Sequence, residues 1–263
     1  MQKIISISNQ KGGVGKTTTA VNLSSCIANL GIKTLLIDID PQANATTGIG
    51  LEPKDDGNSI YEILVSDKKA KDVVQPTQIE NLYIIKSNIN LVAAELELVT
   101  LENRESILRT KLAELANADS GYDFRFIFID CPPSLGLITI NSLNAADTVL
   151  IPVQCEYYAL EGLSALLNTI KMVKNSYNPP LSIEGYLLTM FDSRLKLANQ
   201  VETELRKYFG EKVFDTKISR NVKIGEAPSY GKPIVEYDPY SLGAKHYADL
   251  AEEFVLRNKI TEN

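Results

Sequence analysis

Short runs of apolar, often β-branched residues alternate along this chain with longer segments of helical periodicity. The apolar runs predict strands over residues 4–8, 34–39, 83–86, 126–129, 148–153 and 183–188. The helical patterns cover residues 16–30, 91–101, 106–115, 160–173, 201–209 and 243–256. The strand runs are continuously apolar, which is typical of a mostly parallel sheet covered by helices on both faces. Residues 51–77 are the least regular stretch, and we expect a surface insertion there.

Length and composition narrow this picture to an ordinary globular α/β protein. The chain has 263 residues, of which 44% are hydrophobic and 23% charged, and it contains no linker or repeat, so we expect one domain over residues 1–263. No apolar stretch approaches the 18 residues of a spanning helix. Cys26, Cys131, Cys155 and the single His246 are widely spaced, which indicates neither a disulfide framework nor a zinc site and fits a reducing cytoplasm.

Charge is distributed unevenly along the chain. The net charge is −6, which argues against a protein that coats nucleic acid by bulk charge. Residues 192–232, however, carry nine Lys or Arg against six acids, a local charge of +3 that leaves −9 for the remainder. A local basic patch is therefore compatible with the acidic total.

The segment of residues 9–19, Asn-Gln-Lys-Gly-Gly-Val-Gly-Lys-Thr-Thr-Thr, leaves a predicted strand and opens a predicted helix. That context is the one a phosphate-binding loop requires. Its three glycines let successive backbone N–H groups point inward, and the helix N-terminus adds partial positive charge. Lys16 can reach the β and γ phosphates, and the Thr17 hydroxyl can ligate Mg²⁺. A plain glycine turn would not explain Gly-Lys-Thr at the start of the helix.

Acidic residues follow two of the predicted strands. Asp38 and Asp40 share one face of the strand end at residues 34–39, at the edge where ligands bind in open α/β sheets. Asp130 follows the apolar run 126–129, and we expect it to hold Mg²⁺ through a water molecule. The alternative for each acid is a cap of the turn that follows. Pro132 and Pro133 stiffen the next loop, which would then sense the γ-phosphate.

The phosphate loop resembles the deviant Walker A motif of the ParA/MinD superfamily. Gln10 replaces the first glycine of the generic pattern, and Lys11 stands at the position of the superfamily's signature lysine. Further blocks look like the chromosomal ParA (Soj) branch: 141–143, 152–156, 159–162, 189–194 and 220–229. The resemblance covers nearly the whole chain and implies a P-loop NTPase fold. One departure is Ser219, because the family often has proline immediately before Arg-Asn-Val.

The resemblance also implies roles for individual residues. Lys11, Lys16 and Asp40 would be catalytic, with Lys11 crossing to the nucleotide of a facing subunit and Asp40 positioning the attacking water. The metal site for Mg²⁺ would consist of Thr17, Asp40 and Asp130, with Asp38 supporting it. The residues expected to bind ATP or ADP are Lys11, Gly12, Gly13, Val14, Gly15, Lys16, Thr17, Thr18 and Met190.

The partners implied by the resemblance are a second copy of the chain, DNA and a ParB-like protein. We expect a homodimer in the ATP state that binds double-stranded DNA without sequence preference and is stimulated by a centromere-bound ParB, in the cytoplasm and on the nucleoid. The DNA-binding candidates are Arg194, Lys196, Arg220 and Lys223, all in the basic segment. The first strand begins near the start of the chain, so we expect phosphate contacts rather than an operator-reading helix-turn-helix.

Three other classes of protein are alternatives to a partitioning ATPase. A MinD-like membrane ATPase would need a basic amphipathic terminal helix, whereas residues 246–259 include Asp249, Glu252 and Glu253 and predict a helix packed on the domain. An iron–sulfur carrier on the same fold would need a second cysteine to accompany Cys131 at an interface. A scaffold that only binds nucleotide would not need Lys11, Asp40 and Asp130 together.

Overall fold

The computed structural model describes residues 2–116, 121–156 and 159–258. Across these residues, seven strands form a sheet in the order β3-β4-β2-β5-β1-β6-β7. Every pairing is parallel except that of β3 with β4, so the predicted mostly parallel sheet is confirmed. The strands are β1 (Lys3–Ile7), β2 (Thr34–Asp38), β3 (Gln75–Pro76), β4 (Leu82–Ile85), β5 (Phe126–Asp130), β6 (Thr148–Gln154) and β7 (Ser182–Thr189).

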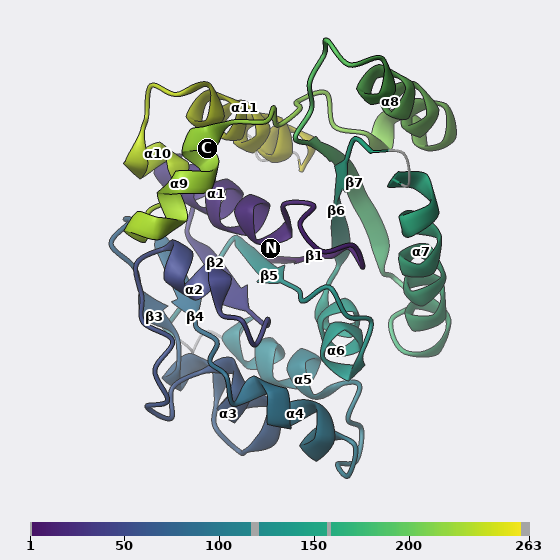
Figure 1. The fold of residues 1–263 in the computed structure, drawn as a ribbon. Helices are drawn as coiled ribbons and strands as arrows, with labels where there is room; N and C mark the ends of the chain where they lie inside the picture. The colour runs from purple at the N-terminus through teal and green to yellow at the C-terminus, as the bar shows by residue number, and fades with distance from the viewer. Residues whose placement is uncertain (1, 117–120, 157–158, 259–263) are drawn as a thin grey trace.

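Helices cover both faces of this sheet (Figure 1). The α-helices are α1 (Lys16–Asn29), α2 (Asn44–Gly48), α3 (Ile60–Val65), α4 (Leu91–Leu98), α5 (Ile107–Ala113), α6 (Leu137–Ala145), α7 (Ala159–Ser176), α8 (Lys196–Phe209), α9 (Val222–Glu226), α10 (Ile234–Tyr237) and α11 (Leu242–Arg257). Alternation along β5 shows the two faces. Phe126 and Phe128 pack toward α1 and α11, whereas Ile127 and Ile129 pack toward α3, α4, α5 and α6.

The last helix packs on the domain as predicted. On α11, Tyr247, Leu250 and Phe254 are fully buried beside α1, and the Phe254 ring lies 5.1 Å from the ring of Phe126. Its apolar face is therefore covered by the protein itself. None of the helices described is both long and apolar enough to cross a membrane.

The prediction of a surface insertion at residues 51–77 is wrong. This stretch contains α3, whose Ile60, Ile63 and Leu64 are buried in the core beneath β2 and β5. A capping box formed by Ser59 and Glu62 begins the helix. Six residues make less than two turns, too few for a periodic pattern to stand out in the sequence.

The structure also adds or extends helices that periodicity did not predict. In α6, the buried polar residues Asn141, Ser142 and Asn144 interrupt the apolar pattern of a helix that is nevertheless largely buried. The helix predicted at residues 201–209 begins at Lys196. This DNA-binding candidate therefore lies on the first turn of α8. Lys223 lies in α9, a short helix that the Asn221 side chain caps and that the sequence pattern did not predict.

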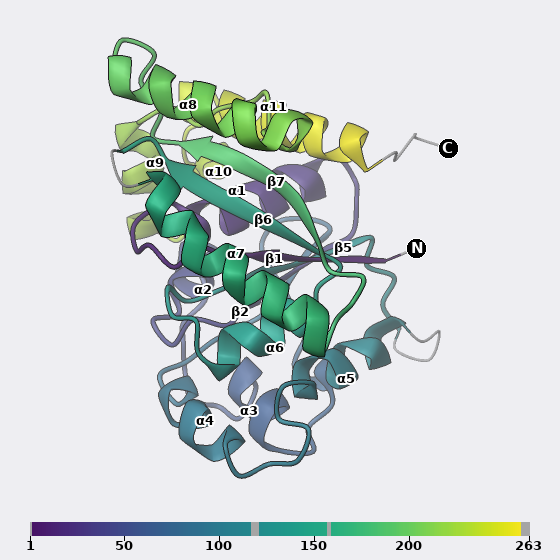
Figure 2. The same cartoon turned by 90° about the vertical axis from the view of Figure 1, so that its right-hand side faces the viewer.

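Sheet topology places the candidate site. The chain passes from β1 to β2, returns through β5 between them, and continues to β6 on the other side of β1. The carboxyl end of β1 is thus a switch point, where open α/β sheets bind ligands. The loop after β1 lies on the same side of the molecule as α2, α4 and α9 (Figure 2).

Candidate active site

The loop between β1 and α1 is wound tightly around its glycines. Gly13 and Gly15 have φ angles of 74° and 87°, a left-handed conformation that side chains disfavour. Gly15 is the N-cap of α1, and no side chain caps that helix end. The Thr189 hydroxyl donates to the Val14 carbonyl oxygen at 2.8 Å and fixes the loop against β7. Uncapped N–H groups at a helix start within a glycine-rich loop form an anion site.

Two lysines approach this loop in different ways. Lys16 is 6% exposed, and its Nζ donates to the Lys11 carbonyl oxygen at 3.2 Å. Burial lowers the pKa of Lys16, while Asp130 and Asp40 oppose that shift. The side chain of Lys11, by contrast, reaches out of the loop and forms an ion pair with Glu156. One lysine therefore serves the interior of the loop and the other its outer surface.

Carboxylates from neighbouring strand ends meet beside the loop. Asp38 and Asp130 are directly opposite in the parallel pairing of β2 with β5. Asp38 accepts hydrogen bonds from the Thr46 N–H at 2.8 Å, the Thr46 hydroxyl at 2.7 Å and the Asp40 N–H at 3.1 Å. Burial raises the pKa of Asp38 to about 6 despite these bonds. Asp38 thus has a structural task, which is to hold the turn from β2 into α2.

Asp130 is buried but does not receive hydrogen bonds like those of Asp38. Neither of its carboxylate oxygens has a hydrogen-bond partner within normal geometry, and the residue is 0% exposed. Burial, followed by the charge of Asp38, raises the pKa of Asp130 well above its usual range, while Thr17 and Lys16 oppose the shift. Burying a carboxylate without hydrogen-bond partners costs free energy of folding unless a cation neutralises the charge. The donor set therefore fits a hard divalent cation such as Mg²⁺.

Asp40 lies at the mouth of the same site. It is 7% exposed, and one of its oxygens accepts the Gln42 N–H at 2.9 Å, while the other accepts no hydrogen bond from the described residues. Among the residues described, no group of three His, Cys, Asp or Glu side chains is arranged to hold a metal ion alone. A cation here would need the Thr17 hydroxyl, phosphate oxygens or water as further ligands.

A largely apolar cavity of about 380 Å³ adjoins the phosphate loop. It runs from Gly15 and Thr18 to Met190, a non-glycine residue with a φ of 48°. The lining residues that the sequence did not assign to the nucleotide are Thr189, Ile218, Ser219, Arg220, Asn221, Ile224, Gly225, Pro228 and Tyr247. The family-like block 220–229 covers Asn221, Ile224 and Pro228, and the resemblance implies an adenine-side loop there, whereas no sequence pattern marked Ile218 or Tyr247. The cavity has the position and character of a site for a nucleotide base.

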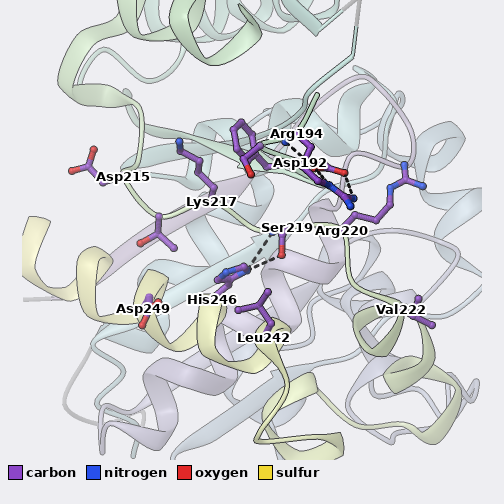
Figure 3. A pocket seen from close by; sticks show the side chains of 13 residues that line it. Asp192, Arg194, Asp215, Lys217, Ser219, Arg220, Val222, Leu242, His246 and Asp249 are labelled. Carbon is purple, nitrogen blue, oxygen red and sulfur yellow. Dashed lines mark hydrogen bonds and ion pairs between the residues drawn. The ribbon is translucent and has the colours of Figure 1, made fainter. Parts of the chain in front are cut away.

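Two of the four basic candidates line a wider groove (Figure 3). Arg194 and Arg220 lie there with Lys217 and His246, but Asp192, Asp215 and Asp249 line it too. Arg194 donates from Nε and Nη2 to Asp192 at 2.9 and 2.6 Å, and this contact lowers the pKa of Asp192 to about 2.

The other candidates differ in their surroundings. Lys196 lines an adjacent hollow with Arg194, whereas Lys223 pairs with Glu226 at 2.8 Å on α9. Within the described part of the chain, the side chains of Arg220 and Lys196 form no ion pair or hydrogen bond, and both residues are exposed. Ser219 takes a specific partner: its N–H and its hydroxyl lie 3.3 and 3.1 Å from His246 Nδ1. A proline there would lack that N–H.

A family model and several curated proteins match this chain over most of its length. A family model described as an AAA domain matches residues 2–183. Soj, the sporulation initiation inhibitor protein of Bacillus subtilis (strain 168), is 55% identical over 253 residues, covering 96% of this chain and 98% of its own. The chromosome partitioning protein ParA of Myxococcus xanthus (strain DK1622) is 51% identical over 256 residues, covering 97% of this chain and 89% of its own.

Solved structures extend the likeness to the fold. The cobyrinic acid a,c-diamide synthase of Mycobacterium smegmatis superposes with a TM-score of 0.81 at 32% identity, covering 96% of this chain and 93% of its own. That protein was crystallised with ADP and magnesium, and also with an ATP analogue and magnesium.

Proposed function

The chain belongs to the AAA-domain family matched over residues 2–183 and, within it, to the Soj/ParA chromosome partitioning ATPases, and we propose that it hydrolyses ATP to drive DNA segregation. In this cycle, Mg-ATP brings two copies together with the nucleotides between them. The dimer binds double-stranded DNA without sequence preference in the cytoplasm, on the nucleoid. A ParB-like centromere-binding protein then stimulates an otherwise slow hydrolysis, which releases the DNA.

The observation that carries the proposal is that Lys16 is buried inside the loop while the Lys11 side chain extends out of it. Lys16 is buried beneath the loop, where it would neutralise the phosphates of its own nucleotide. Lys11 reaches outward, where it would add positive charge to the transferring phosphate of a facing subunit. Gly12 lies between them with open space around the position of a Cβ atom, so a second loop has room to approach.

Nucleotide and metal would occupy the groups that the protein leaves unsatisfied. The loop from Lys11 to Thr18 would hold the phosphates through backbone N–H groups, and Met190 would lie against the base. Thr17, Asp40 and Asp130 would bind Mg²⁺, directly or through water. The ion would neutralise charge that develops on the phosphate oxygens. Asp40 would orient the attacking water, because only one of its two oxygens accepts a hydrogen bond from the described residues.

DNA binding would use phosphate contacts from the basic residues. Arg220 and Lys196 are free to make them, while Arg194 and Lys223 would first have to leave Asp192 and Glu226. One protomer offers few cations, but a dimer doubles them, which would make binding depend on ATP.

The decisive experiment measures DNA binding with ATP, with ADP and without nucleotide, together with ATP turnover in the presence and absence of a ParB-like partner. We expect binding with ATP alone and faster turnover with the partner. Equal DNA affinity in all three states would contradict the proposal. ATP-dependent sedimentation with anionic vesicles in place of DNA would favour a MinD-like membrane ATPase.

A further inference from the structure

The segment that carries Asp40 is a tight turn between β2 and α2. Residues 39–43 form it, and we call it the Asp40 turn. The Asp40 carbonyl oxygen accepts the Ala43 N–H at 2.9 Å. Ala43 has a φ of 52°, in the left-handed region that a residue with a Cβ atom disfavours. Such a backbone persists only where its surroundings hold it, so the Asp40 turn depends on contacts outside itself.

One carboxylate contacts both ends of the Asp40 turn. Asp38 Oδ1 accepts the Asp40 N–H at 3.1 Å, and Asp38 Oδ2 accepts the Thr46 N–H at 2.8 Å and the Thr46 hydroxyl at 2.7 Å. The Thr46 carbonyl oxygen accepts the Leu51 N–H at 3.1 Å, beyond the end of α2. Asp38 and Thr46 are both 0% exposed. The orientation of the Asp38 carboxylate therefore determines how the Asp40 turn leaves β2.

The Thr46 hydroxyl is oriented by a third segment of the chain. Its oxygen accepts the Ser87 N–H at 3.0 Å. A backbone N–H only donates, so the single hydrogen of the hydroxyl is left for Asp38. The hydrogen bonds thus run from the residues after β4, through α2, to the end of β2.

The residues after β4 are fixed by α3, the helix in the stretch where a surface insertion was expected. The Lys86 carbonyl oxygen accepts the Ile60 N–H at 2.9 Å, and the Lys86 side chain pairs with Asp56 at 2.6 Å. The Ser87 hydroxyl has no hydrogen-bond partner among the described residues. Ser87 therefore contributes its backbone N–H, and its side chain is not needed.

The Asp38 carboxylate lies beside a group of the same charge. Asp38 and Asp130 are opposite each other in the pairing of β2 with β5, and two carboxylates at neighbouring positions repel each other. Among the hydrogen bonds that Asp38 accepts from the described residues, only that of the Thr46 hydroxyl comes from a side chain. Without this hydroxyl the carboxylate would be held less firmly against the repulsion.

We propose that Thr46 is a positioning residue for ATP hydrolysis, which acts on Asp40 through the Asp38 carboxylate. Thr46 orients Asp38, and Asp38 holds the backbone N–H of Asp40. The Asp40 turn then keeps in place the carboxylate that would orient the attacking water. The inference rests on the proposed function for its effect on catalysis, but its effect on the Asp40 turn can be measured without nucleotide.

Amide hydrogen exchange, followed by NMR in the nucleotide-free protein, tests the structural step. Thr46→Val removes the hydroxyl and keeps the shape of the side chain. Exchange of the Asp40 N–H, and of the Gln42 N–H that donates to Asp40 Oδ1, should accelerate about tenfold or more, because a hydrogen bond to a carboxylate is lost. Thr46→Ser keeps the hydroxyl and should restore slow exchange. Unchanged exchange in Thr46→Val would overturn the proposal.

Two neighbouring hydroxyls provide matched controls. The exposed Thr47 hydroxyl donates to the Ala43 and Asn44 carbonyl oxygens, both at 3.3 Å, and does not contact Asp38. Thr47→Val therefore makes the same change on the same helix. Ser87→Ala removes a hydroxyl without a partner and keeps the N–H. Both variants should exchange and hydrolyse ATP like the wild type. An effect in either as large as that of Thr46→Val would overturn the assignment to Thr46.

Single-turnover hydrolysis tests the catalytic step. Thr46→Val should lower the rate about tenfold or more with little change in ATP affinity, and Thr46→Ser should recover most of it. In an Asp40→Ala background, Thr46→Val should have no further effect, because it acts only through Asp40. A native rate in Thr46→Val, or fully additive losses in the double variant, would overturn this inference alone. A native rate in Asp40→Ala would overturn the role of Asp40 in the proposed function, and this inference with it.

Discussion

Asp38 and Asp130 lie opposite each other on neighbouring strands, yet their carboxylates differ in hydrogen bonding. The oxygens of Asp38 accept hydrogen bonds from Thr46 and Asp40, whereas neither oxygen of Asp130 accepts one of normal geometry, and Thr17 and Lys16 only partly offset its burial. A protein that buries an uncompensated carboxylate loses stability by doing so. Binding of a cation to Asp130 would compensate for that loss of stability.

Replacing Asp130 with Asn should therefore stabilise the nucleotide-free protein while abolishing hydrolysis. The folded state raises the pKa of Asp130 above its unfolded value, so the wild type should lose stability as pH rises from about 4 toward 7. Asn carries no titrating proton, so the slope should be shallower and unfolding at pH 7 should cost about 1–3 kcal/mol more. Urea denaturation at several pH values measures this. A less stable variant would contradict the account.

Lys16→Ala should lose ATP binding, because the phosphates lose the buried cation of the loop. We expect affinity to fall about a hundredfold or more, which is two steps of 1.4 kcal/mol. Isothermal titration calorimetry gives the answer, with the exposed Lys33→Ala as a control for the loss of one positive charge. Normal affinity in Lys16→Ala would remove the assignment of the phosphate loop.

Asp40→Ala should keep ATP binding and lose turnover. A carboxylate that orients water acts on the chemical step, so kcat should fall by about 10²-fold or more with little change in nucleotide affinity. A long-lived ATP-bound dimer is the expected product. If single-turnover hydrolysis continues at the native rate, Asp40 serves only to cap the turn at Gln42.

At the scale of the element, the phosphate loop contains two kinds of glycine. Gly13 needs its left-handed backbone, with φ at 74°, for the loop to form. Gly12 is not in that region, and a Cβ atom there would meet nothing within 4 Å in its own chain. What Gly12 provides is clear space on the outside of the loop.

Gly12→Val should therefore bind ATP as a monomer, because the side chain obstructs only a second subunit. Gly13→Val should weaken ATP binding itself, since valine disfavours a positive φ. Light scattering with ATP separates the two effects when it is paired with a nucleotide-binding assay. An intact ATP dimer of Gly12→Val would refute the close approach of two loops.

At the scale of the whole molecule, an acidic protein still presents exposed cations along a groove that Asp192, Asp215 and Asp249 also line. Pairing inside the groove, however, makes its cations unequal. Arg194 pairs with Asp192, whereas Arg220 is exposed and its side chain forms no ion pair or hydrogen bond with the described residues. Arg220 is thus the stronger of the two DNA-binding candidates that line the groove.

Arg220→Glu should weaken DNA binding equally across sequences and flatten the salt dependence by about one unit per lost phosphate contact. Arg194→Glu should have a smaller effect, because Asp192 already neutralises that guanidinium. The exposed Lys69→Glu, near α3 and away from the groove, applies the same charge change as a control. Affinity measured at several salt concentrations decides the matter. An unchanged slope in Arg220→Glu would exclude it from the DNA surface.

Local sequence determined the parts of this protein whose chemistry and structure depend on neighbouring residues. The glycines and lysines of residues 9–19 specify a phosphate loop wherever they stand between a strand and a helix. The continuous apolar runs specify buried parallel strands, and an acid at a strand end can be placed at the ligand edge of the sheet.

Only the tertiary structure decided what depends on residues distant in the chain. It placed α3 in the core, gave Asp38 its partner Thr46 while leaving Asp130 without one, and paired Arg194 and Lys223 with acids. The walls of the base cavity come from segments far apart in the chain, Gly15 and Tyr247 among them. Burial and pairing are properties of the folded surroundings, so no local pattern reports them.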